Sequence, residues 1–182
     1  MSIVLVPIGE VDGKVLEFIG QALERTFDQP YSIAPAIPLP AQAYNPYRHQ
    51  YFSDLLLRLL EEVEAPGAER VLGVVDVDLY TEGLNFIFGQ ASLRGRDAII
   101  SLARLRQSFY GLPEDEDLFL ERAVKEAVHE LGHTYGLGHC PDPYCVMHFS
   151  NSLADTDVKQ ATFCPRCSQA LRLSRRKRSA SI

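Results

Sequence analysis

The sequence contains no apolar run long enough to cross a membrane and no cysteine before residue 140. Its apolar opening, MSIVLVPIG, lacks the positively charged start of a secretion signal and is interrupted by Pro7 and Gly9. We therefore expect a buried strand at this end and no membrane contact. Without an export signal, a cytoplasmic location is the natural interpretation, and cysteines in a reducing compartment are more often metal ligands or free thiols than disulfides.

Acidic residues are absent from residues 172–182, which carry five positive charges, whereas the whole chain has a net charge of −6. Residues 1–171 therefore carry −11. An acidic body argues against general binding to nucleic acid, and a short basic end is more often a solvated tail than a docking arm. We expect one domain over residues 1–171 and a disordered tail over residues 172–182. A monomer is the favoured state.

The hydrophobic pattern predicts an α/β (α+β) fold. Helical spacing runs over residues 13–27 and 51–63 and again after PEDED at 113–117, whereas strand-like runs cover residues 2–8, 31–37, 70–80, 84–91 and 98–105. The early strands are joined by helices, as parallel strands are, whereas short turns flank residues 84–91. We therefore predict a mixed, mostly parallel, twisted sheet with an antiparallel edge strand and helices packed on it.

The stretch HELGHTYGLGHC, residues 129–140, holds three of the five histidines. His129 and His133 are one helical turn apart, so both imidazoles can meet one Zn²⁺ at about 2.0–2.1 Å. Gly136 can end the helix in a left-handed conformation, and the chain can then return His139 as a third ligand. Incidental histidines on a helix are the alternative, but they do not explain the glycine.

Three neutral nitrogen ligands leave a fourth zinc position for water, which distinguishes a catalytic zinc from a structural one. Glu130 lies beside the histidine pair in the sequence and can accept the proton of that water as it attacks a carbonyl. The pattern is therefore typical of amide hydrolysis with Glu130 as the general base.

The four cysteines form two pairs, CPDPYC at 140–145 and CPRC at 164–167. Two such pairs can enclose a second zinc in a closed tetrahedral site, which would form a small zinc-bound segment over residues 140–171. Because neighbouring residues of an extended chain point in opposite directions, His139 can face one metal and Cys140 the other. Two local disulfides or a redox-active CPRC pair are the alternatives that the spacing leaves open.

The whole pattern, HELGHTYGLGHCPDPYCVM followed by CPRC, resembles the archaemetzincin family of metzincin-like zinc proteins. The resemblance implies a compact metzincin-like fold and two zinc ions per chain. It implies a catalytic zinc on His129, His133 and His139, Glu130 as general base, Met147 as the apolar Met-turn, and a structural zinc on Cys140, Cys145, Cys164 and Cys167. The insert between Met147 and Cys164 has 16 residues, which is one fewer than is usual in this family.

In metzincins the edge strand of the sheet pairs with an extended substrate, and residues 84–91 are the candidate here. Phe88 and Gly89 on that strand, and His148 after the Met-turn, are the candidate substrate contacts. Glu126 lies one turn before His129 and could orient a ligand imidazole, although a surface carboxylate is the plainer interpretation. His49 is expected to be incidental.

The leading hypothesis is therefore a zinc metallopeptidase that acts on small peptides. A zinc-stabilised binding module is the alternative, in which the four-cysteine segment and the basic tail contact nucleic acid. The acidic body and the presence of Glu130, which no structural zinc needs, argue against it.

Overall fold

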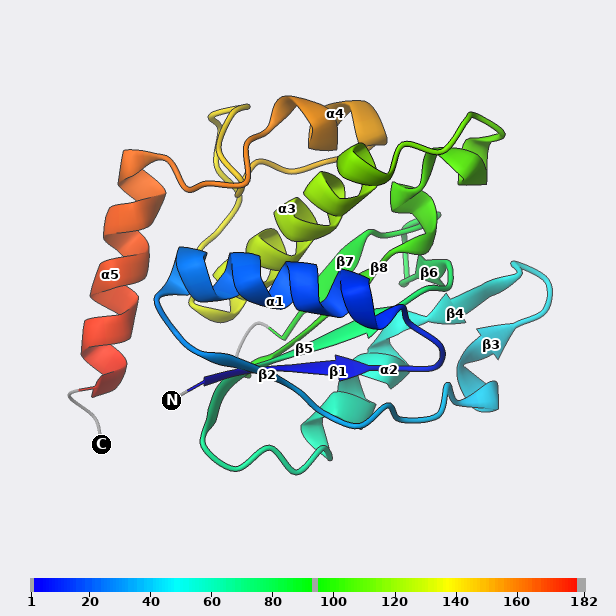
Figure 1. Cartoon of the computed structure of the whole chain (residues 1–182), viewed down its shortest axis with the longest axis horizontal. Coiled ribbons are helices and arrows are strands. Elements are labelled where there is room, and N and C mark those ends of the chain that lie inside the picture. Colours follow the sequence, from blue (N-terminus) through cyan, green and yellow to red (C-terminus); the bar gives the residue numbers. More distant parts are fainter. Residues whose placement is uncertain (1, 93–94, 180–182) are drawn as a thin grey trace.

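A five-stranded sheet forms the centre of the computed structural model, which describes residues 2–92 and 95–179 (Figure 1). Its strand order is β2-β1-β5-β8-β7, and every neighbouring pair is parallel except β7 and β8. The strands are β1 (Ser2–Pro7), β2 (Tyr31–Ile33), β5 (Ala68–Val75), β7 (Gly89–Ala91) and β8 (Asp97–Ser101). The predicted mixed sheet with an antiparallel edge strand is confirmed.

Helices cover both faces of this sheet. Helices α1 (Gly13–Phe27) and α3 (Glu116–Thr134) lie on one face (Figure 1), where they pack with β1, β5 and β8 in the larger hydrophobic core. Helix α2 (Ser53–Glu61) packs on the opposite face in a second core that includes Val71 and Ile99. The central strands β1, β5 and β8 are covered on both faces, so their inner residues, 3–6, 71–75 and 98–100, are apolar or glycine.

The sequence did not predict a second, three-stranded sheet. It consists of β3 (Tyr44–Asn45), β4 (Gln50–Phe52) and β6 (Leu79–Tyr80). The helix expected at residue 51 begins only at Ser53, because Tyr51 and Phe52 pair with β6. The strand expected over residues 70–80 stops at Val75 and resumes as β6 after an interruption. Tertiary pairing outweighs local pattern at these positions.

The two later predicted strands are shorter than expected. Only the last part of the run at 84–91 forms β7, whereas residues 84–88 are irregular apart from a bridge between Ile87 and Leu79. Strand β8 ends at Ser101 and is followed by two 3₁₀ turns, η2 (Ala103–Leu105) and η3 (Gln107–Tyr110). The irregular segment passes the open side of α3, where the candidate site lies.

The chain ends with α4 (Leu153–Val158) and α5 (Pro165–Ser179), and α5 lies along one side of the molecule (Figure 1). The expectation of a disordered tail is therefore corrected for residues 172–179, whereas residues 180–182 lie outside the described chain. Ser174 Oγ donates to Tyr135 O at 2.5 Å and Arg175 Nη1 donates to Phe27 O at 2.6 Å, which ties α5 to α3 and α1. No helix in the described ranges has the length and apolar composition of a membrane span.

Candidate metal centre

Helix α3 brings the two histidines of the HELGH motif together. Asp115 caps the helix, because its Oδ1 accepts a hydrogen bond from Leu118 N at 3.0 Å, and carboxylates in the first turn suit the positive end of the helix dipole. Near the other end of this unbroken helix, the Nε2 atoms of His129 and His133 lie 3.0 Å apart. His139 completes the group, since the three ligand nitrogens lie within 4.8 Å of one another.

The backbone fixes which nitrogen of each helical imidazole carries the hydrogen. His129 Nδ1 lies 2.8 Å from Val146 O, and His133 Nδ1 lies 2.7 Å from Leu137 O. A carbonyl oxygen can only accept, so Nδ1 is the donor and Nε2 keeps its lone pair. Two lone pairs at 3.0 Å repel each other unless a cation lies between them. This arrangement suits a metal ion.

Burial also favours the neutral imidazoles that a metal requires. The pKa of His129 is lowered well below its ordinary value by burial, and the positive charge of Lys159 adds to the effect. Burial likewise lowers the pKa of His133 and of His139. All three side chains are therefore neutral at neutral pH.

The turn after α3 returns His139 to the two helical histidines. Gly136 has φ +86°, a left-handed conformation that resists a Cβ, and its amide donates to His133 O at 2.8 Å. The amide of Leu137 then donates to Gly132 O at 3.2 Å. The helix ends here as the sequence predicted, and the turn is the device that gathers the third histidine.

Glu130 is buried beside the histidines, against the edge strand. A Cβ built on Gly89 of β7 would lie 2.6 Å from Glu130 Cγ and 2.8 Å from Glu130 Oε1. The absence of a side chain at Gly89 is therefore what admits this carboxylate. Burial raises the pKa of Glu130 well above its ordinary value, the charge of Glu126 raises it further, and Lys159 opposes the shift. A carboxylate in this setting takes up a proton readily.

Glu126 is not a surface carboxylate. It is 3% exposed, and its Oε1 lies 2.9 Å from Lys159 Nζ, which is itself fully buried. Thr156 Oγ1 donates to the same oxygen at 3.3 Å. The pair joins α3 to the end of α4, directly behind the histidines. Sequence reasoning missed Lys159, because nothing in its local sequence distinguishes it from a surface lysine.

A cavity of about 380 Å³ opens in front of these groups. Its lining includes the three histidines, Glu126 and Glu130 on one side, and the irregular segment over residues 84–89 on the other. Phe149, Ser150 and Asn151 form a further wall. Phe88 and Gly89, the predicted substrate contacts, line this cavity. His148 does not: its Nδ1 lies 2.8 Å from Cys140 O, so it supports the cysteine loop instead. His49, expected to be incidental, lies 3.2 Å from Tyr44 Oη, away from the histidines.

The four cysteines form a second cluster with all sulfurs within 4.8 Å of one another and no disulfide. Cys140 Sγ and Cys164 Sγ are 3.8 Å apart, which is the edge of about 3.8 Å expected for a tetrahedron with zinc–sulfur distances of about 2.3 Å. Hydrogen bonding, led by that from the Cys167 amide, lowers the pKa of Cys164 to about 7, which favours the thiolate that binds metal. The geometry suits a closed zinc site.

The two clusters share one loop. Cys140 N donates to Met147 O at 2.8 Å, and Met147 is fully buried. A Cβ on Gly132, which lies between the two helical histidines, would be 2.5 Å from Met147 Sδ. The thioether therefore packs directly under the histidine-bearing turn of α3, in the position expected of an apolar floor.

Three imidazoles placed to bind one metal, a buried carboxylate next to them and a cavity in front distinguish a catalytic zinc site from the closed cysteine site. The fold and these two sites define a zinc metallopeptidase of the metzincin type. The chain belongs to the archaemetzincin family, since the family model described as Peptidase family M54 matches residues 31–173.

Known proteins agree with this assignment over almost the whole chain. An archaemetzincin of Methanocaldococcus jannaschii is 46% identical over 94% of this chain and 93% of its own length. An archaemetzincin of Pyrococcus furiosus is 48% identical over 93% of this chain and 91% of its own length. The crystal structure of the Methanopyrus kandleri archaemetzincin has a TM-score of 0.83 at 37% identity and covers 96% of each chain. That of the Archaeoglobus fulgidus protein, complexed with malonate, has a TM-score of 0.81 at 38% identity, over 93% of this chain and 99% of its own.

Proposed function

We propose that Glu130 is the catalytic base of a peptidase that hydrolyses bonds in small peptides. The observation that carries this proposal is the position of its buried carboxylate between Gly89 of the edge strand and the histidine cluster. His129, His133 and His139 hold the catalytic zinc, and the four cysteines hold the structural zinc. Zinc held by the three imidazoles supplies a Lewis acid that makes water acidic near neutral pH and polarises a carbonyl.

Glu130 performs the proton transfers. Its carboxylate accepts the proton of the attacking water and then delivers this proton to the nitrogen of the leaving amine. The raised pKa of Glu130 suits both steps, because a carboxylate that holds a proton firmly is a better base. Gly89 keeps the space that this side chain needs.

The other residues of the site orient the reacting groups. The carbonyls of Val146 and Leu137 keep the two helical imidazoles in one tautomer and one orientation. Met147 supports the turn of α3 from below. Phe88 and Gly89, at the edge of the sheet, contact the substrate, with the unpaired side of β7 available to extended peptide backbone.

We also propose that residues 1–171 are one catalytic domain, to which the helical part of the tail is docked. Four reduced cysteines arranged for zinc favour a reducing compartment, the cytoplasm, as the place of action. We favour a monomer, because both hydrophobic cores and both metal-binding clusters are formed within one chain.

The test is cleavage of a diverse peptide pool by zinc-loaded protein, read by mass spectrometry. Wild type is compared with Glu130→Gln at equal zinc content. We expect the variant to lose at least about a hundredfold in rate and to keep both zinc ions, since Glu130 is not a ligand. Equal cleavage by both proteins would mean a contaminating peptidase. No cleavage by either would favour a zinc-stabilised binding module.

A further inference from the structure

The hairpin of β3, β4 and the turn between them, residues 44–52, carries a concentration of aromatic side chains that the catalytic site does not use. We refer to these residues as the aromatic hairpin. Four of the eight tyrosines lie in it or on the adjoining β6: Tyr44, Tyr47, Tyr51 and Tyr80. Tyr47 is 96% exposed at the tip and Tyr44 is 40% exposed. Single exposed rings are common on proteins, and what distinguishes these rings is the way the hairpin holds them.

Side-chain hydrogen bonds from one residue hold the turn of the aromatic hairpin together. Asn45 Oδ1 accepts hydrogen bonds from Tyr47 N at 3.0 Å and from Arg48 N at 3.2 Å, and Asn45 Nδ2 donates to Tyr80 Oη at 3.2 Å. The rings of Tyr44 and Tyr51 lie 5.0 Å apart. An aromatic side chain presented on so fixed a backbone can bind a partner at little entropic cost.

The aromatic hairpin is also attached to the rim of the catalytic cavity. Arg48 Nη2 donates to Leu84 O at 3.1 Å and to Asn85 O at 2.9 Å, and Gln50 Nε2 donates to Asn85 O at 2.9 Å. Leu84 and Asn85 both line the cavity, and Leu84 is 48% exposed. These contacts place the aromatic hairpin directly beside the part of the cavity rim that Leu84 and Asn85 form.

The Arg48 side chain on this surface is exposed, but its guanidinium is engaged within the protein. The Arg48 guanidinium lies 4.3 Å from the centre of the Tyr80 ring and gives hydrogen bonds to backbone carbonyls. Beside the exposed Arg48 and His49, the aromatic hairpin offers rings and hydroxyl groups outward, and such groups are suited to apolar and aromatic side chains of a peptide.

We propose that the aromatic hairpin is an exosite that binds apolar side chains of the same peptide whose scissile bond lies in the cavity. This inference rests on the proposed function, because the occupant of the cavity is taken to be a peptide. An extended chain covers about 3.3 Å per residue, so about six additional residues extend the reach of a substrate by about 20 Å. Peptides that are long enough gain affinity from the exosite, and short ones do not.

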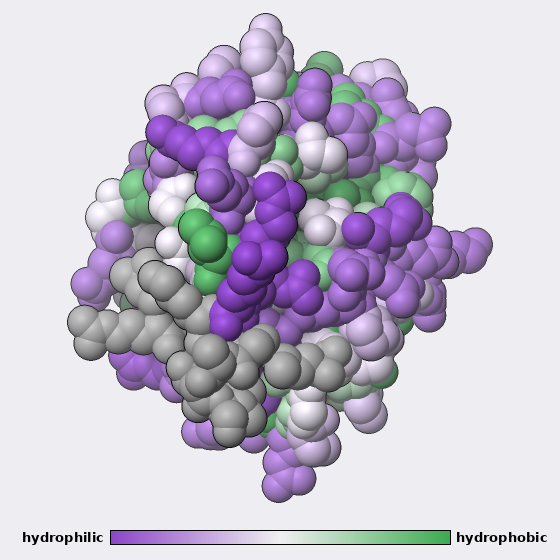
Figure 2. All heavy atoms as spheres, turned by 90° about the vertical axis from the view of Figure 1, so that its left-hand side faces the viewer, coloured by the Kyte–Doolittle hydropathy of each residue, from purple (hydrophilic) through white to green (hydrophobic). Residues whose placement is uncertain are grey.

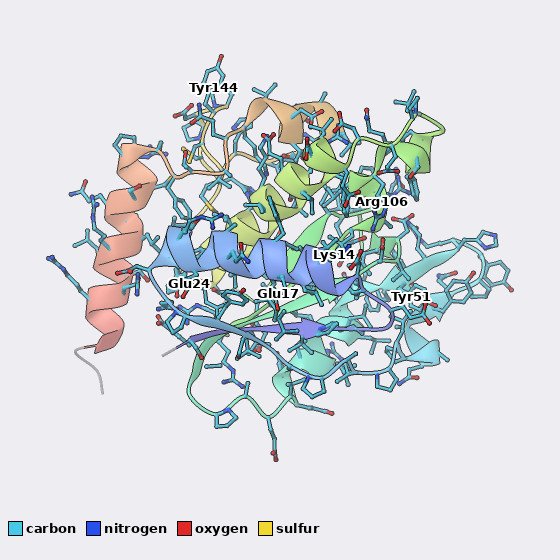
Figure 3. All side chains as sticks on the ribbon, viewed as in Figure 1. Lys14, Glu17, Glu24, Tyr51, Arg106 and Tyr144 are labelled. Atoms are coloured by element: carbon cyan, nitrogen blue, oxygen red, sulfur yellow. The ribbon has the colours of Figure 1, made fainter. Side chains whose placement is uncertain are left out.

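The experiment uses two peptides with the same central sequence, one of about six residues and one of about twelve with added Phe and Leu. Their binding to the zinc-loaded Glu130→Gln protein is measured by fluorescence anisotropy, with and without Tyr47→Ala. The control is Tyr144→Ala, an equally bulky exposed side chain on the cysteine loop. Figure 3 shows Tyr144 directed outward, far from Tyr51.

We expect Tyr47→Ala to weaken binding of the long peptide about fivefold and to leave the short peptide unchanged. In the cleaving enzyme the same change should raise KM for the long peptide at constant kcat. If Tyr47→Ala leaves the affinity for the long peptide unchanged, or if Tyr144→Ala lowers that affinity equally, the exosite is overturned. If wild type cleaves neither peptide while long-peptide binding still depends on Tyr47, the exosite stands and the peptidase assignment of the cavity fails.

Discussion

At the scale of single residues, Gly89 determines whether the general base fits. The added methyl group of Gly89→Ala would fall 2.6 Å from Glu130 Cγ and 2.8 Å from Ile99 O, so either the carboxylate or the edge strand must move. We expect at least about a tenfold loss in kcat, because small displacements of a catalytic group are costly, with both zinc ions retained. Steady-state kinetics and metal analysis measure this.

Gly13→Ala is the control for that change. A Cβ at Gly13 meets nothing within 4 Å, so this variant should keep wild-type kinetics. Full activity in Gly89→Ala would show that Glu130 does not need its present position.

Lys159 is a second residue whose importance only the folded structure reveals. Lys159→Met leaves the buried Glu126 carboxylate without its partner, and breaking a buried pair in this way costs about 3–5 kcal/mol. The double change with Glu126→Gln removes both charges and should recover most of that loss. Urea unfolding at fixed free zinc measures the free energies; a double variant no more stable than Lys159→Met contradicts the pairing.

The carboxyl group of Asp97 gives a pH-dependent effect outside the metal sites. Burial raises its pKa above the ordinary value, and Arg96 at 3.8 Å offsets only part of this. The folded state therefore prefers protonated Asp97, and this stability is lost as the pH rises through the raised pKa. Asp97→Asn does not ionise, so its stability relative to wild type should increase from pH 3.5 to pH 7. Denaturant unfolding of the two metal-free proteins at both pH values measures the difference; a constant difference contradicts the prediction.

At the scale of elements, the end of α3 depends on backbone conformation and not on packing. Cβ atoms on Gly136 and on Gly138 both meet nothing within 4 Å, but only Gly136 has a positive φ. Gly136→Ala should therefore cost about 1–2 kcal/mol and weaken zinc binding at the histidine site, because His139 is presented by this turn. Gly138→Ala is the matched control. Competition with a chelator compares their affinities, and equal affinities would mean that the turn does not hold His139.

The helices and strands also show which parts of the fold the sequence can predict. The pattern of Gly13–Phe27 predicts its helix to the residue, because this segment has one apolar face and a capping Asp12. Strands β3, β4 and β6 are too short for a periodic signal and exist only because they pair with one another. Helix α5 was missed because its composition is polar. The face of the molecule with α5 is largely hydrophilic (Figure 2), and the helix is held by backbone contacts through Ser174 and Arg175.

The site likewise combines residues that the local sequence reveals with residues whose roles depend on contacts between distant segments. The ligand histidines and cysteines are recognisable because their spacing along the chain reflects metal geometry. Gly89 was predicted as a substrate contact, but its role in admitting Glu130 depends on a contact between distant segments. Lys159 was not predicted, for the same reason.

At the scale of the whole molecule, the four-cysteine zinc joins α5 to the loop that presents His139. Cys164→Ser combined with Cys167→Ser should reduce zinc to one ion per chain at most. The apparent binding free energy of a structural zinc is on the order of 10 kcal/mol. Without this zinc, α5 should lose its protection from hydrogen exchange. The histidine site should also bind its own zinc more weakly. Arg172→Ala, an exposed change on the same helix, is the control. Two zinc ions in the double variant would contradict the four-cysteine site.

The sharing of one loop by both metal sites also has a consequence during synthesis. The histidines and Glu130 leave the ribosome before Cys164 and Cys167, and until these two thiols arrive the loop between His139 and Met147 has no second anchor. A nascent chain therefore carries its reactive groups without the frame that aligns them. An aligned histidine site is therefore expected only after Cys164 and Cys167 have left the ribosome.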